Sequence, residues 1–195
     1  MNKQITLAQY RTVDLTIMAV LMTASQVVIQ AAATLWFPEQ LYIVSPVAAV
    51  VTLVMMRWGL WAAVHAALGG VVFTAAAGGT LEQTLIYTAG NLLALLIVPL
   101  LKIVGKEKIQ KSGFLSLMMA LAVQALMLVG RALVAFALQY EPLACLHFIT
   151  TDFLSVLFTL VVIWIARKAD GLFEDQKHYL LRVQRERENE RRDQF

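Results

Sequence analysis

The stretch Leu126-Met127-Leu128-Val129-Gly130-Arg131-Ala132-Leu133-Val134 decides the fold, because it places an arginine inside an apolar run of membrane-spanning length. A guanidinium cannot give up its charge, so its position in lipid is costly unless another group accepts it. Asp152, in the next apolar run, is the candidate acceptor. The two runs meet near Glu141, ten positions after Arg131 and eleven before Asp152. Antiparallel helices joined there would hold both charges at one depth, either as a structural ion pair or as part of a ligand site.

The composition is that of a membrane protein. Of the 195 residues, 59% are hydrophobic and 15% are charged, and the mean hydropathy is +0.70. The formal net charge of +3 is spread along the chain, so we expect no nucleic-acid partner. The single cysteine, Cys145, cannot form an internal disulfide. We expect no cleaved signal peptide, because the first apolar run is long enough to span and lacks a cleavage site.

Six apolar segments approach the ~20 residues that cross a bilayer, which predicts an all-α membrane protein with six transmembrane helices. The second segment is short and contains Pro46, so we expect a kinked or partly interfacial helix there. The segments form one transmembrane domain, residues 1–168. A charged tail, residues 169–195, is expected to continue from the last span as a solvated helix. The predicted segments are residues 15–37, 41–56, 58–77, 83–104, 114–140 and 143–166.

Lysine and arginine gather on one side of these segments, which predicts that the N and C termini are both cytoplasmic. The loops of the other side carry only acidic charges, Glu39, Glu82 and Glu141. We therefore expect a multi-pass protein of the cell membrane, in contact with lipid. The cytoplasmic cations are Lys3, Arg11, Arg57, Lys102, Lys106, Lys108, Lys111, Arg167 and Lys168.

Motifs of catalysis are missing from the sequence. It has no His-Glu-x-x-His, no Gly-x-Ser-x-Gly, no phosphate-binding glycine loop and no paired-cysteine metal site. Because His65, His147 and His178 are scattered, we expect no shared metal site and no cofactor. We therefore expect a protein that is not an enzyme, with an intramembrane enzyme as a remaining alternative.

Polar side chains recur at helical spacing in the half of the segments away from the cytoplasm. In the fourth segment they lie at positions i, i+4 and i+8, on one face of a helix. Lipid penalises such groups, so they must face a cavity or one another. They predict either an outward-open ligand cavity, closed below by apolar residues, or polar contacts that hold helices together. The candidate substrate-binding residues are Gln26, Gln30, Gln83, Tyr87, Asn91, Arg131, His147, Thr151 and Asp152.

The N-terminal sequence Arg11-Thr12-Val13-Asp14-Leu15-Thr16-Ile17-Met18-Ala19-Val20-Leu21-Met22-Thr23-Ala24 adds a family resemblance. Together with six predicted spans, it resembles the substrate-binding S component of an energy-coupling factor (ECF) transporter. The resemblance covers residues 8–168 and rests on layout more than on individual letters. The first helix of that family carries an Ala-x-x-x-Ala face that docks on a transmembrane coupling subunit. The matching positions are Ala19 and Thr23, with threonine in place of the second alanine.

The resemblance implies an S-component bundle in a prokaryotic plasma membrane that works with a coupling subunit and two ATPase subunits. Such a protein captures a water-soluble vitamin or related micronutrient with high affinity and topples in the membrane to release it. Cobalamin or a related corrinoid is the first expectation. Pantothenate, whose carboxylate Arg131 could bind, is the second. A competing interpretation is a membrane scaffold similar to the cell-shape protein MreD, without a small-molecule ligand.

Overall fold

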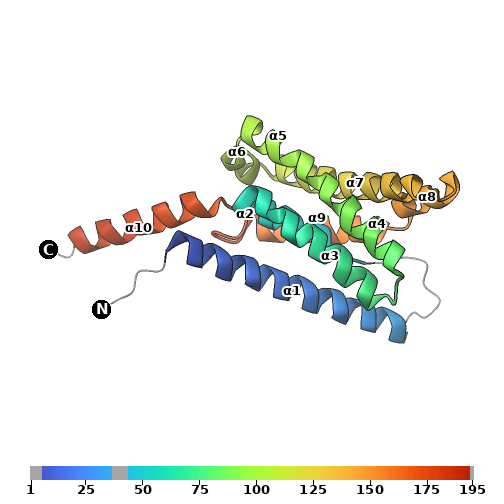
Figure 1. The fold of residues 1–195 in the computed structure, drawn as a ribbon. Coiled ribbons are helices and arrows are strands. Elements are labelled where there is room, and N and C mark those ends of the chain that lie inside the picture. Colours follow the sequence, from blue (N-terminus) through green and yellow to red (C-terminus); the bar gives the residue numbers. More distant parts are fainter. Residues whose placement is uncertain (1–5, 37–43, 194–195) are drawn as a thin grey trace.

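A computed structural model describes residues 6–36 and 44–193, and within these ranges the chain is helical apart from turns (Figure 1). In this part of the chain, five helical runs are long and apolar enough to cross a membrane, which is compatible with a multi-pass protein. Six complete spans and cytoplasmic termini stay predictions. The five runs are Leu7–Trp36, Val47–Ala76, Leu81–Val104, Gly113–Ala137 and Pro142–Ala166.

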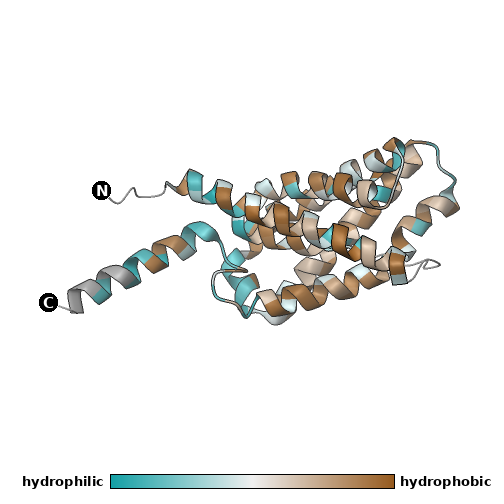
Figure 2. Cartoon of the chain, turned by 90° about the horizontal axis from the view of Figure 1, so that it is seen from below, coloured by the Kyte–Doolittle hydropathy of each residue, from teal (hydrophilic) through white to brown (hydrophobic). Residues whose placement is uncertain are grey.

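The start of α1 (Leu7–Trp36) and the helix α10 (Gln176–Asp193) lie at the same end of the helical bundle (Figure 1). We call this the tail end; it holds the turn at Gly59 and the start of α10 (Gln176–Asp193). The opposite end, which holds the turns at residues 77–80 and 138–141, is the loop end. Hydrophilic residues gather at the tail end and along α10, whereas the helices between the two ends are mainly hydrophobic (Figure 2).

Helix α1 (Leu7–Trp36) lies at the edge of the bundle (Figure 1). Over its 30 residues, the buried side chains are Met18, Met22 and Gln26. Large apolar side chains on the opposite face are exposed, with Val20 at 60% and Val28 at 66%. An apolar face of this kind is stable only against lipid or a partner protein.

The run Val47–Ala76, which is one of the five by length and composition, turns back at Gly59 and consists of two shorter helices. Helix α2 (Val47–Trp58) has 12 residues, about 18 Å, and ends where Gly59 adopts a φ of +63°. After η1 (Gly59–Trp61), α3 (Ala62–Ala76) returns beside α2. The contact is close: a side-chain carbon at Gly69 of α3 would overlap the Val47 side chain of α2. The expectation of a kinked or partly interfacial helix over residues 41–56 stays a prediction, because residues 41–43 lie outside the described part of the chain. Helix α2 is short and enclosed by α1, α3, α7 and α9, since almost all of its side chains are apolar and buried.

Local signals begin and end the remaining helices. Helix α4 begins at a capping box in which Thr80 and Gln83 each accept a hydrogen bond from the other's backbone N–H. Helix α7 begins at Ser112, whose hydroxyl accepts from the backbone of Leu115. The remaining elements are α4 (Leu81–Asn91), η2 (Leu92–Leu96), α5 (Ile97–Val104), α6 (Lys106–Lys111), α7 (Gly113–Ala137), α8 (Pro142–Thr150) and α9 (Phe153–Ala166).

The tail is not a direct continuation of the last apolar helix. Residues 167–175 form turns that pack back on the bundle, and Phe173 is only 1% exposed within its core. Gln176 closes these turns, because its amide donates to the carbonyl of Gly171 at 2.7 Å and accepts from the Tyr10 hydroxyl at 3.0 Å. Helix α10 then projects away from the bundle (Figure 1). The expectation of an uninterrupted helix is therefore wrong, whereas the charged outer helix is present.

We expect Gln176→Ala to loosen the tail by about 1–2 kcal/mol, because it removes the hydrogen bond to the Gly171 carbonyl and leaves the Tyr10 hydroxyl without the Gln176 acceptor. Limited trypsin digestion should then cleave the purified protein faster after Lys168. Gln184→Ala, on the exposed surface of α10, is the matched control and should leave the rate unchanged. Equal rates for the two variants would mean that Gln176 does not hold the tail.

A buried ion pair ties this tail to α1 and α2. The guanidinium Nε of Arg57 donates to Asp14 at 2.9 Å, and the indole of Trp58 donates to the same carboxylate at 2.6 Å. Arg57 Nη1 donates to the carbonyl of Gly171 at 2.6 Å. Arg57, one of the cations expected on the cytoplasmic side, is therefore buried and hydrogen-bonded to Asp14 and to the tail.

Candidate functional site

Arg131 of α7 forms the centre of a polar cluster in the apolar bundle. Its Nη1 donates to Asp152 at 2.7 Å, and its Nε donates to the Asn91 side chain at 2.9 Å. The guanidinium carbon lies 4.5 Å from the centroid of the Tyr87 ring, in a cation–π contact. The Arg131 and Asp152 side chains are only 5% and 8% exposed, so each charge depends on the other for its stability.

Asp152 accepts hydrogen bonds from three side chains of two helices. Besides Arg131, the amide of Gln124 on α7 donates at 3.3 Å and the hydroxyl of Ser155 on α9 donates at 2.7 Å. The Asp152 carboxylate is thus fixed opposite Arg131 by donors from α7 and α9.

The cluster continues through hydrogen bonds to the remaining helices. The Ser155 hydroxyl accepts from the backbone N–H of Ser45 at 3.0 Å, and the Ser45 hydroxyl donates to Gln26 of α1 at 2.7 Å. On the other side, the Asn91 amide donates to the carbonyl of Ala66 on α3 at 3.1 Å. One polar layer therefore joins α1, the start of α2, α3, α4, α7 and α9.

One donor of this layer has no partner among the described residues. Gln26 is 0% exposed, and its amide nitrogen makes no hydrogen bond there, although its oxygen accepts from Ser45. A buried donor without a partner costs about 1–3 kcal/mol. The polar layer therefore carries an unused donor that a small polar molecule could satisfy.

Two helices change their geometry at this layer. Asn91 is the last residue of α4, and the chain continues as the tighter 3₁₀ turn η2. Asp152 lies in the break between α8 and α9. Interrupted helices free backbone groups from their regular bonds, and in transport proteins they occur where ions and substrates bind.

Glycines set the position of Arg131 against Asn91. A side-chain carbon at Gly90 would lie 2.5 Å from the backbone nitrogen of Arg131, and one at Gly130 would overlap the carbonyl of Gly90. The backbones of α4 and α7 therefore touch beside the cluster. Such close approach is the use that membrane helices make of small residues.

The structure brings together five of the nine predicted binding residues and separates four. Tyr87, Asn91, Arg131 and Asp152 lie in the cluster, and Gln26 joins it through Ser45 and Ser155. The other four lie outside it. Gln83 is exposed in the cap of α4, His147 is exposed on α8, Gln30 is half-buried on α1, and the half-buried Thr151 donates to the carbonyl of His147.

Ser45 and Gln124 belong to the cluster but were missed in the sequence. Gln124 lies seven residues before Arg131, a spacing that puts the two on one face of a helix, and this signal was available. Ser45 had no such signal, because it contacts Ser155, 110 residues away in sequence. Ala19 and Thr23, the predicted docking residues, are half-buried beside the exposed face of α1.

In comparisons with known proteins, no protein-family model matches the chain, and no curated protein or solved structure matches it significantly.

Proposed function

We propose that this protein is a solute-binding membrane subunit that captures a small polar molecule in the layer around Arg131. The observation that carries the proposal is a polar layer, enclosed by apolar helices, that retains the amide donor of Gln26, which is unpaired among the described residues. The helix interruptions at Asn91 and Asp152 support it, because they supply groups that can rearrange around a ligand. In this proposal the chain spans the membrane six times with cytoplasmic termini.

The S component of an ECF importer is the specific form of this proposal. The chain carries no ATP-binding motif, so uptake would need a coupling subunit and two ATPase subunits from elsewhere. The exposed apolar face of α1 supports a partner in the membrane. The substrate would be a water-soluble vitamin that enters from the loop end.

The chemistry of the layer limits the substrate. Arg131 and Asp152 already neutralise each other, so a neutral or zwitterionic ligand, or one carboxylate that displaces Asp152 from Arg131, would fit. The contacts of the layer are compact, which favours pantothenate over the much larger corrinoids. Binding would require the surrounding helices to separate.

Native mass spectrometry of the gently purified protein with a panel of water-soluble vitamins tests the proposal. We expect one vitamin to be retained, and Gln26→Met to weaken its binding at least tenfold, because methionine keeps the volume but removes the amide. Gln83→Ala, outside the cluster, is the control and should bind normally. A retained vitamin that binds Gln26→Met as tightly as the wild type would place the binding site elsewhere.

A scaffold without a small-molecule ligand is the second candidate. It is favoured by the mutual hydrogen bonds of the cluster, which can serve as a lock between helices. A protein that retains no vitamin from the panel would support this candidate, and membrane protein partners would then be sought.

We expect Ala19→Trp to block uptake while ligand binding stays within about twofold of the wild type. The indole would crowd the side of α1 that the proposed coupling subunit contacts. Position 19 lies seven residues, about two helical turns, from Gln26, so the ligand contact should be spared. Uptake of the labelled vitamin by cells that also produce the ATPase module is the measurement. Ala125→Trp, on the exposed surface of α7, is the matched control. Normal uptake by Ala19→Trp would contradict the proposal that the coupling subunit docks on this side of α1.

A further inference from the structure

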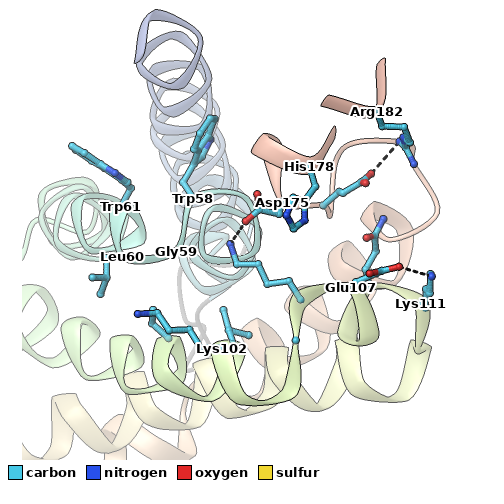
Figure 3. A pocket seen from close by; sticks show the side chains of 16 residues that line it. Trp58, Gly59, Leu60, Trp61, Lys102, Glu107, Lys111, Asp175, His178 and Arg182 are labelled. Carbon is cyan, nitrogen blue, oxygen red and sulfur yellow. Dashed lines mark hydrogen bonds and ion pairs between the residues drawn. The ribbon is translucent and has the colours of Figure 1, made fainter. Parts of the chain in front are cut away.

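A cavity of about 950 Å³ opens at the tail end, away from the Arg131 layer. It lies between the turn at η1, the end of α5, α6 and the start of the tail (Figure 3). The end of α5, α6 and the start of the tail each adjoin an end of a helical run that is long and apolar enough to span, and η1 is the turn between α2 and α3 at the same end of the bundle. The cavity is therefore at the level where a membrane-embedded bundle meets the lipid headgroups.

One side of the cavity is apolar. Trp58, Leu60 and Trp61 line it from the α2–α3 turn, and Val98 and Leu101 line it from α5. The side chains of Leu60 and Trp61 are 63% and 44% exposed. Tryptophan is typical of the interface between hydrocarbon and headgroups, where an apolar ring and a polar N–H are both satisfied.

The other side of the cavity is charged, and most of its charges are paired. Lys106 contacts Asp175 at 2.7 Å, Lys111 contacts Glu107 at 2.6 Å, and Arg182 contacts Glu174 at 3.1 Å (Figure 3). Burial alone would raise the pKa of Asp175. The hydrogen bond and the positive charge of Lys106 outweigh this effect, so the pKa lies below its usual value and the carboxylate stays ionised near neutral pH. Within the described residues, Lys102 has no ion-pair partner.

We propose that this cavity binds an anionic glycerophospholipid, with its phosphate at Lys102 and Lys106 and its acyl chains along Leu60 and Trp61. The unpaired Lys102 supplies the charge that the phosphate needs. The neighbouring carboxylates can accept hydrogen bonds from headgroup hydroxyls, as in phosphatidylglycerol. The apolar side would be superfluous for a soluble phosphate compound, which is why a lipid is the occupant. The proposal rests on the membrane location alone and is independent of the solute at Arg131.

Tryptophan fluorescence of the full-length protein, freed of lipid in a neutral detergent, provides the test. The substitutions Trp36→Phe and Trp164→Phe leave the two cavity tryptophans, Trp58 and Trp61, as reporters. Phosphatidylglycerol with brominated chains is added, since bromine quenches indole only at close range. Brominated phosphatidylcholine, with the same chains but no net charge, is the lipid control.

We expect phosphatidylglycerol to quench at a concentration at least fivefold lower than phosphatidylcholine. Lys102→Gln should raise that concentration about fivefold, the effect of one lysine near an anionic lipid. Lys108→Gln is the matched control, because Lys108 is an exposed lysine of α6 that does not line the cavity. Equal quenching by the two lipids, or equal effects of the two substitutions, would overturn the proposal. So would complete displacement of the lipid by glycerol phosphate alone, which would indicate a soluble ligand.

Discussion

Arg131→Ala is expected to lower the free energy of unfolding by about 3–5 kcal/mol, the cost of leaving one charge of a buried ion pair without its partner. Asp152 would keep only the neutral donors Gln124 and Ser155, in a surrounding where its side chain is 8% exposed. Thermal unfolding of the purified protein in detergent measures the loss. Arg182→Ala is the matched control, since the ion pairs of Arg182 are in contact with water and should contribute little.

The double variant Arg131→Met with Asp152→Leu separates the structural role of the pair from ligand binding. Removing both charges leaves no unpaired ion, so we expect most of the lost stability to return. Vitamin binding should be lost in this double variant, because the layer no longer holds its charged groups. A stable double variant that binds the vitamin normally would show that the pair is structural only. An Arg131→Ala protein as stable as Arg182→Ala would contradict the argument from burial.

Gly130→Val is expected to destabilise the protein by about 3 kcal/mol, near the upper end of the usual cost of overpacking. A β-carbon at this position overlaps the backbone carbonyl of Gly90, and a backbone cannot move aside as a flexible side chain can. The α4 and α7 backbones would separate, and the 2.9 Å bond between Arg131 and Asn91 would lengthen. The same change should therefore weaken solute binding.

Ala125→Val serves as the control for this prediction. It adds methyl groups to the same helix on an exposed surface, where space is open, so its unfolding midpoint should stay close to the wild type. The two midpoints are compared in one detergent. If the unfolding midpoint of Gly130→Val equals that of Ala125→Val, the close approach of α4 and α7 does not hold the cluster in place.

The agreement between sequence and structure is best where the signal is local or repeats along one helix. The apolar segments predicted the helical runs, because length and composition suffice to recognise a membrane helix. Arg131 and Asp152 were expected at the same depth, because they lie nearly the same number of residues from the loop at Glu141. In the structure, Arg131 Nη1 lies 2.7 Å from an Asp152 carboxylate oxygen. Tyr87 and Asn91 followed from their helical spacing.

The sequence was a poor guide wherever the orientation of a helix decides the outcome. Gln83 shares a stripe with Tyr87 and Asn91, yet its amide caps its own helix, because it lies in the first turn. His147 shares a predicted stripe with Ser155, but the helix is interrupted between them at residues 151–152. A stripe predicts a common face only as long as the helix continues.

By itself, the sequence determined that this is an apolar helical protein with an arginine in an apolar segment. It also indicated that the arginine pairs with a carboxylate, because an unpaired guanidinium in lipid is energetically costly. Only the tertiary structure decided that α2 is enclosed by other helices, that Ser45 and Gln124 complete the polar layer, and that the tail folds back to form a cavity beside Lys102. These features depend on contacts between residues far apart in the chain, which arise from the packing of whole helices and leave no periodic pattern in the sequence.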